Sequence, residues 1–193
     1  MKRLFAVALL SMIGMSSAGA ETPREALAAA RSHLDALASY HLHLEDGTEP
    51  TDIDYTLPDR LRITKPGSVG IIVGGGVYLN VGGAGWTPGG VNTTLGVLMV
   101  TLAEDRLINF TDDDEIADQG DETLDGVSMH KYEIRTPLNG IFLTRVVWVG
   151  AKDGLPHRVE RNGGTTSLTA TYSKFNQGFG IEVPANMQPG TQP

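Results

Sequence analysis

The sequence contains no cysteine among its 193 residues. This absence excludes a disulfide framework, a thiolate metal site and a cysteine nucleophile. It also excludes a lipid-modified cysteine behind an export signal, so we expect no stable membrane anchor. A chain of this length can bury enough apolar surface to fold without such cross-links.

Positive charge is also scarce. The chain has 15 basic and 23 acidic side chains, for a net charge of −8. Residues 1–20 contain Lys2 and Arg3 and no acid, which leaves 13 basic and 23 acidic residues, a net charge of −10, in the remainder. Binding to nucleic acid requires basic side chains that neutralise the phosphates. Attraction to anionic lipid headgroups requires basic side chains as well. We therefore expect neither kind of partner.

The chain lacks an apolar run of the length that spans a bilayer, about 20 residues. Its uncharged run, residues 4–15, follows two basic residues and precedes Ala18 and Ala20. This order is typical of a secretory signal peptide, with a buried N-terminal helix as the alternative. We expect a signal peptide over residues 1–20, one domain over 21–183, a disordered tail over 184–193, and a periplasmic location.

Two segments have helical character. Thr22, Pro23 and Glu25 form a capping-box pattern, and apolar residues with helical spacing follow, which predicts a helix over residues 23–39. Residues 92–107 show a second apolar pattern of this period. Alternating apolar and polar residues predict strands over 40–45, 53–57, 60–64, 69–73, 77–81, 127–135, 141–149, 155–161 and 165–175.

Glycine-rich turns join several of these strands, at residues 65–67, 74–76 and 151–154. Residues 112–121 are rich in Asp and Glu and predict an acidic loop. The order of helix, strands, helix and strands predicts an α+β domain. It has one large antiparallel sheet with both helices on one side.

Five segments of the chain follow the pattern of one protein superfamily. They are residues 55–63, the hairpin 71–81 followed by Trp86, residues 124–134, residues 148–160, and residues 172–176 before Val183 and Pro184. The chain resembles the periplasmic lipoprotein-carrier (LolA/LolB-like) superfamily, nearest its mycobacterial lipid-binding lipoprotein branch. It departs from that branch by lacking the lipidation cysteine, and by having three glycines, residues 74–76, in the central hairpin.

The resemblance implies a half-open β-barrel, a single curved sheet whose concave side is packed with helices and lined by apolar side chains. Members hold acyl chains there and carry lipids or lipoproteins between membranes. We expect an exported, non-catalytic protein that binds a lipid, a lipoprotein acyl chain or another apolar ligand. Two alternatives stay open: an interaction module of the same fold with a filled interior that docks an envelope protein, and a hydrolase of envelope polymers.

The expected ligand contacts are apolar residues of the helices and strands. They are Leu34, Leu37, Val77, Leu79, Trp86, Leu98, Phe142, Val146 and Trp148. Phe142, Val146 and Trp148 share one strand face, while Val147 and Val149 share the other, and the pattern leaves the inward face open. Trp148 precedes the turn at 151–154, where we expect the mouth of the pocket.

Polar sites of other kinds are weakly supported. His41 and His43 share a strand face, a spacing that zinc can use, but no third ligand is evident. The acidic segment 112–121 lacks the alternation and central glycine of a calcium loop. The glycines at 74–76 do not open a helix as a phosphate-binding loop does. We expect no metal and no cofactor.

Overall fold

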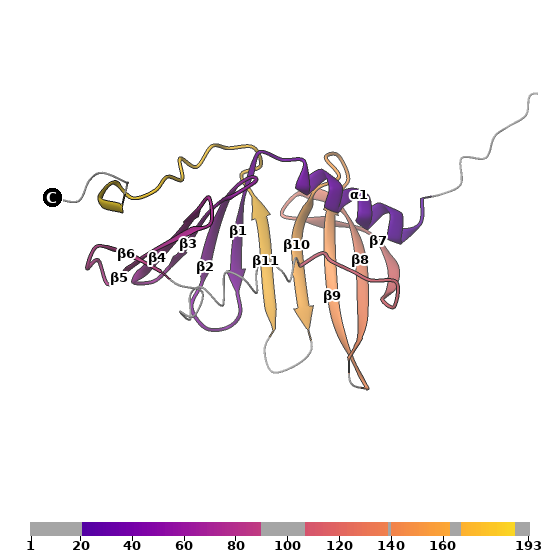
Figure 1. Ribbon diagram of the computed structural model, residues 1–193. Helices are drawn as coiled ribbons and strands as arrows, with labels where there is room; N and C mark the ends of the chain where they lie inside the picture. Colours follow the sequence, from indigo (N-terminus) through magenta and orange to yellow (C-terminus); the bar gives the residue numbers. More distant parts are fainter. Residues whose placement is uncertain (1–20, 90–106, 139, 163–166, 188–193) are drawn as a thin grey trace, which may run out of the picture.

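The computed structural model describes residues 21–89, 107–138, 140–162 and 167–187. Within them one α-helix and eleven strands form a single sheet-based domain (Figure 1). The elements are α1 Pro23–Asp35, β1 Ser39–Glu45, β2 Thr51–Thr56, β3 Arg60–Lys65, β4 Ser68–Val73, β5 Gly76–Val81, β6 Trp86–Pro88, β7 Glu115–Leu124, β8 Val127–Leu138, β9 Ile141–Gly150, β10 Pro156–Asn162, β11 Leu168–Ser173 and the 3₁₀ helix η1 Ala185–Met187.

The first helix begins as the sequence predicts. The Thr22 side chain accepts a hydrogen bond from the Glu25 backbone N–H at 3.3 Å, and the Thr22 backbone N–H donates to the Glu25 carboxylate at 2.8 Å. This capping box satisfies donors that the first helical turn leaves unpaired. The helix ends at Asp35, four residues before the predicted end. It stops because Ser39 already pairs with Thr56 in the β1–β2 ladder.

The sheet consists of two antiparallel meanders joined at their centre. Its strand order is β6-β5-β4-β3-β2-β1-β11-β10-β9-β8-β7. Sequence neighbours pair throughout except at the centre, where β1 pairs with β11 and His41 lies opposite Ser173. β6 and β7 are the two ends of this order, so the curved sheet does not close. The predicted α+β half-barrel is confirmed. The predicted turn at residues 74–76 is shorter than expected, because Gly76 already pairs with Val73 and only Gly74 and Gly75, at φ 56° and 81°, form the turn.

The hydrophobic core lies on the concave face of the sheet, beneath α1 (Figure 1). Leu27, Ala30 and Leu34 supply the buried side of the helix. The sheet contributes alternate residues from paired strands, so that partners such as Val147 and Val159 face the same side. The largest of the fully buried side chains of the sheet on this face are Ile53, Ile63, Ile134, Val147 and Val159. The predicted second helix, residues 92–107, lies outside the described residues except for Leu107.

A strap of residues 107–114 crosses the concave face and is held there by two arginines. Arg145 on β9 donates to the backbone carbonyl of Asn109 and pairs with the buried Asp114 carboxylate at 3.6 Å. Arg24 on α1 donates to the backbone carbonyls of Thr111 at 2.9 Å and Asp114 at 2.7 Å. The sheet and the helix therefore fix the same segment from two sides.

The acidic segment 112–121 is only partly a loop, which corrects the sequence prediction. Residues 115–121 belong to β7, an edge strand that pairs with β8, and Ile116 lies opposite Ile134 in the core. Edge strands tolerate charged side chains because only one neighbour covers them, so composition alone hides the strand. Gly120, at φ 80°, lies at a bulge where the register with β8 shifts.

We expect Arg145→Met to lower the free energy of unfolding by about 3–5 kcal/mol, because the substitution leaves the buried Asp114 carboxylate without its cation. Urea denaturation measures this effect. The control is Arg135→Ala, which breaks an exposed ion pair with Glu115 and should cost no more than about 1 kcal/mol. Adding Asp114→Leu to Arg145→Met should recover much of the loss. A cost below 1 kcal/mol for Arg145→Met would show that the strap does not depend on this pair.

Candidate ligand-binding cavity

A cavity of about 280 Å³ remains on the concave side, between the end of α1, the strap and strands β1–β4 and β11. Leu34 borders it from the helix, and Leu107 and Ile108 border it from the strap. The strand side chains that line it include Tyr40, Leu42, Tyr55, Leu61, Ile72 and Tyr172. Most of this wall is apolar or aromatic, as in ligand pockets that exclude water from their floor.

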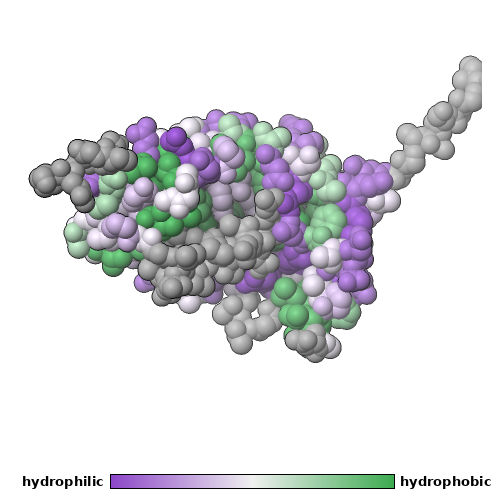
Figure 2. Space-filling model, in the orientation of Figure 1, coloured by the Kyte–Doolittle hydropathy of each residue, from purple (hydrophilic) through white to green (hydrophobic). Residues whose placement is uncertain are grey.

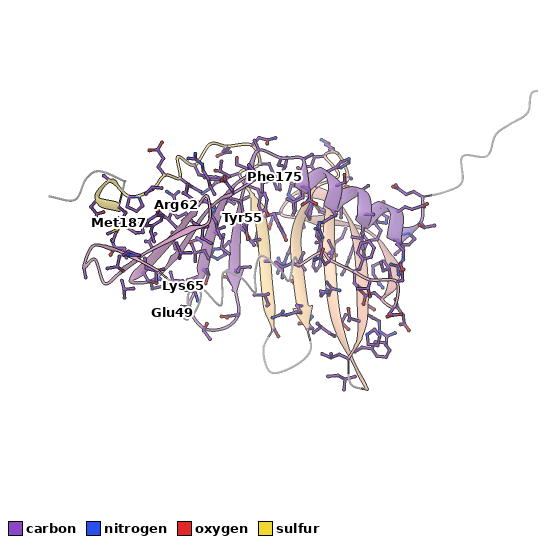
Figure 3. The ribbon with its side chains drawn as sticks, in the orientation of Figure 1. Glu49, Tyr55, Arg62, Lys65, Phe175 and Met187 are labelled. Carbon is purple, nitrogen blue, oxygen red and sulfur yellow. The ribbon has the colours of Figure 1, made fainter. Side chains whose placement is uncertain are left out.

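Three tyrosines from three strands form the aromatic part of the wall. The rings of Tyr40 and Tyr55 stack at a centroid distance of 4.5 Å, and Tyr172 lies 6.0 Å from Tyr40. Figure 3 labels Tyr55 and Phe175 at the same end of the sheet, beside the last turn of α1. Burial raises the pKa of Tyr55 to about 12 and raises the pKa of Tyr40 and Tyr172 as well. The aromatic wall is therefore uncharged at any physiological pH.

Charged side chains lie at one border of the cavity. Arg31 and Asp35, one helical turn apart on α1, form an ion pair at 3.1 Å. Arg60 on β3 donates a hydrogen bond to the backbone carbonyl of Ile181 at 2.8 Å, which ties the segment after β11 to this border. The cavity thus combines an apolar, aromatic wall with a border that carries both signs of charge.

Of the nine expected ligand contacts, four lie on the concave side. A fifth lies outside the described residues. Leu34 lines the cavity, and Leu37 packs against the core. Val77 and Leu79 face the concave side through their pairing with Ile72 and Gly70. A Cβ atom on Gly89 would lie 2.9 Å from both side chains, so the Gly89 backbone covers them closely. Leu98 lies outside the described residues.

The other four expected contacts lie on the outer, convex face. Trp86 pairs with Asn80, one residue out of phase with Leu79, and Phe142, Val146 and Trp148 alternate with the inward-facing Arg145 and Val147. Their position decides the face that the sequence left open. β9 is apolar on both faces, so its alternation gave no signal for which one is inward.

Trp148 is 5% exposed without contributing to the concave core. Its indole N–H donates to the Glu122 carboxylate at 3.1 Å. The Lys131 ammonium lies 5.1 Å and the Arg158 guanidinium 5.7 Å from the ring centroid. Neighbouring strands therefore bury this ring by cation–π and hydrogen-bond contacts on the outer face, and it does not line the cavity.

The sequence prediction missed most of the cavity wall. Tyr40 and Leu42 alternate on one predicted strand, and Tyr55 and Leu61 lie on two others, so period-two alternation could have nominated them. Local alternation could not predict that these residues come together around one cavity. Tyr172 reaches Tyr40 because β1, the first strand, pairs with β11, the last one, and no local pattern specifies that pairing.

The two histidines of the possible zinc pattern are engaged by carboxylates on the outer face. His41 contacts Asp54 at 2.7 Å, and His43 contacts Asp52 at 2.7 Å. Although burial opposes it, the hydrogen bonds from His41 and Arg62 hold the pKa of Asp54 below its ordinary value. Among the described residues, no group of three or more His, Cys, Asp or Glu side chains is arranged to hold a metal ion.

Comparison with solved structures identifies the architecture. The lipoprotein LppX of Mycobacterium tuberculosis aligns with a TM-score of 0.62 and 15% identity, over 83% of this chain and 100% of that chain. LprF from Mycobacterium bovis aligns with a TM-score of 0.62 and 14% identity, over 84% of this chain and 96% of that chain. This chain has their fold. The likeness in fold to mycobacterial lipoproteins, which we expected from the sequence, is confirmed.

Sequence comparison adds nothing to this likeness, since neither a family model nor a curated protein matches the chain. Within the described residues, no helix is both long and apolar enough to cross a bilayer.

We expect Trp148→Ala to lower the free energy of unfolding by about 3–5 kcal/mol, the usual cost of deleting a buried aromatic side chain. Because the ring lies on the outer face, binding of a fluorescent acyl probe should be unchanged under conditions where the variant is folded. Denaturant titration and probe titration measure the two quantities. The matched control is Trp86→Ala, also on the outer face but only half-buried, which should cost less stability. Weakened probe binding with little loss of stability would contradict this placement.

We also expect a pH dependence of stability from His43. Its hydrogen bond to Asp52 raises the pKa of His43 above the ordinary value, so the folded state binds the proton more tightly than the unfolded state. This contribution is fully present below a pH of about 6.5 and is lost as the pH rises through the folded-state pKa. His43→Gln should remove that part of the pH slope. The two measurements are denaturation across this range and an NMR titration of the His43 ring.

Asp52→Asn is the matched control, because it keeps His43 and removes the carboxylate that shifts its pKa. In this variant the His43 titration should move toward the ordinary value. An unchanged titration would show that Asp52 is not the cause of the shift.

Proposed function

We propose that this protein is a non-catalytic, periplasmic carrier that binds one acyl chain of a lipid or lipoprotein in the cavity beneath α1. The observation that carries the proposal is the cavity itself, an apolar and aromatic hollow on the concave side of an unclosed sheet. Its wall is built from Leu34, the strap and the three tyrosines. An apolar hollow of this kind favours a ligand that needs no precise polar contacts.

The energetics of acyl-chain burial suit such a wall. Each methylene group transferred from water contributes about 0.8 kcal/mol, so a chain of moderate length binds without a directed hydrogen bond. The neutral tyrosine rings add polarisable surface and carry no charge that an acyl chain would have to desolvate. Binding by area alone also explains why the sequence carries no sharp catalytic motif.

The size of the cavity favours a single acyl chain. At about 280 Å³ it lies just below the usual range of ligand pockets, roughly 300–1,000 Å³. The charged border formed by Arg31, Asp35, Asp59 and Arg60 suits the polar end of such a ligand. We therefore propose that the far end of the acyl chain lies against the tyrosines and that the lipid headgroup lies at this border. Export through a signal peptide over residues 1–20 is part of the proposal, and no cofactor is involved.

We expect Ile72→Trp to weaken binding of a fluorescent acyl probe at least tenfold, because Ile72 is half-buried, lines the cavity, and a larger ring would fill it. The matched control is Val69→Trp on the same strand. Val69 is also half-buried but pairs with Asn80 and Thr64 on the outer face, so its replacement should leave binding unchanged. Probe titration of both variants and the parent protein gives the comparison.

Organic extraction of the purified protein followed by mass spectrometry supplies the second arm of the test. We expect an acyl lipid in the parent extract and much less in that of Ile72→Trp. A parent protein that contains no lipid and binds no apolar probe would overturn the carrier proposal. The interior would then be filled, and the interaction module would be the remaining interpretation of this fold.

A further inference from the structure

The β8–β9 hairpin ends in a cluster of exposed large apolar side chains. Leu138 is 50%, Ile141 is 58% and Phe142 is 42% exposed. This hairpin extends below the rest of the sheet in Figure 1, and Figure 2 shows a hydrophobic patch in the same place. The other large exposed apolar residues that the structure describes, Val81 and Val127, belong to other hairpins. Apolar exposure is therefore concentrated at one projecting point, here called the hairpin tip (Leu138, Ile141 and Phe142).

The hairpin tip is apolar on both of its faces. Leu138 lies opposite Ile141 in the register, and Pro137 lies opposite Phe142. Because successive strand residues alternate sides, the first pair faces one way and the second pair faces the other. Docking against a folded protein would cover only one of these faces. A bilayer, in contrast, surrounds an inserted tip on all sides.

The backbone and the charges near the tip are compatible with a lipid surface. The two strands hydrogen-bond to each other up to Leu138 and Ile141, which limits the number of unpaired backbone groups that insertion would bury. Arg135 lies 4.1 Å from the Phe142 ring centroid and forms an ion pair with Glu115 at 2.8 Å. Arg135 lies three residue positions before Leu138 on β8, about 10 Å along the strand, which suits the depth of the headgroup region.

We propose that the hairpin tip inserts shallowly into the interface of a lipid bilayer and holds the protein reversibly at a membrane surface. The three residues of the hairpin tip are not part of the cavity wall. The proposal of membrane insertion can therefore be tested independently of what the cavity contains. Insertion is apolar in origin, and the acidic chain gains nothing from anionic headgroups. Zwitterionic membranes should therefore bind the protein at least as well as anionic ones.

Flotation with phosphatidylcholine vesicles, with and without phosphatidylglycerol, tests the proposal. We expect the parent protein to float with both, and the Ile141→Asp/Phe142→Asp variant to lose at least tenfold in partitioning. The matched control is Val127→Asp, at the opposite end of β8 and 44% exposed, which should float like the parent. Circular dichroism and light scattering confirm that each variant is folded and report its oligomeric state.

Because the chain has no cysteine, a single-cysteine variant carries a label at one defined position. Ile141→Cys bearing an environment-sensitive fluorophore should show a blue shift and brighter emission on vesicles, whereas labelled Val127→Cys should not. This measurement tests the proposal even if the Ile141→Asp/Phe142→Asp variant does not fold. A parent protein that does not float, or an Ile141 label that stays in water on vesicles, overturns the proposal. So does a parent dimer that the tip substitutions dissociate, which would assign the tip to a second copy of this chain.

Discussion

An antiparallel sheet that curves without closing has one apolar face that must be kept from water, and the rest of this structure follows from that constraint. Helix α1 covers part of the concave face with a narrow side of Leu27, Ala30 and Leu34. The strap of residues 107–114 covers a further part. Among the described residues, the cavity lies where neither α1 nor the strap covers the sheet. Its position is thus set by where α1 ends and where the strap crosses.

The strap is held both by apolar packing and by charge, because Leu107 and Ile108 are buried in the core and two arginines bind its backbone. Arg145 reaches it from the sheet and Arg24 from the helix, and both donate to its backbone. Backbone carbonyls in a segment without regular structure need such donors when they are buried. The buried Asp114 compensates the charge of Arg145 at 3.6 Å. Helix, strap and sheet consequently form one connected wall around the cavity.

The outer face uses its polar and aromatic residues in a different way. Carboxylates engage His41 and His43, and Lys131 and Arg158 lie over Trp148. These contacts tie adjacent strands together on a face that no helix covers in the described part of the chain. Charge pairs and cation–π contacts therefore stabilise the outer face, while the concave face carries the apolar core, the tyrosine wall of the cavity and the buried Arg145–Asp114 pair. At the hairpin tip, exposed apolar side chains lie on both faces of the sheet.

The sequence by itself determined most of the features that depend on neighbours along the chain, although the end of α1 and the strand β7 were missed. The capping box at Thr22, the alternation in most strands and the glycine turn after β4 are local, and together they predict an α+β domain with one antiparallel sheet. The half-barrel shape was expected from the family resemblance. Only the tertiary structure decided that β1 meets β11, that Trp148 faces outward, and that an acidic segment is the edge strand β7. The reason is physical. Strand pairing over a long sequence separation and the choice between two apolar faces depend on which surfaces meet, and local propensity does not encode that choice.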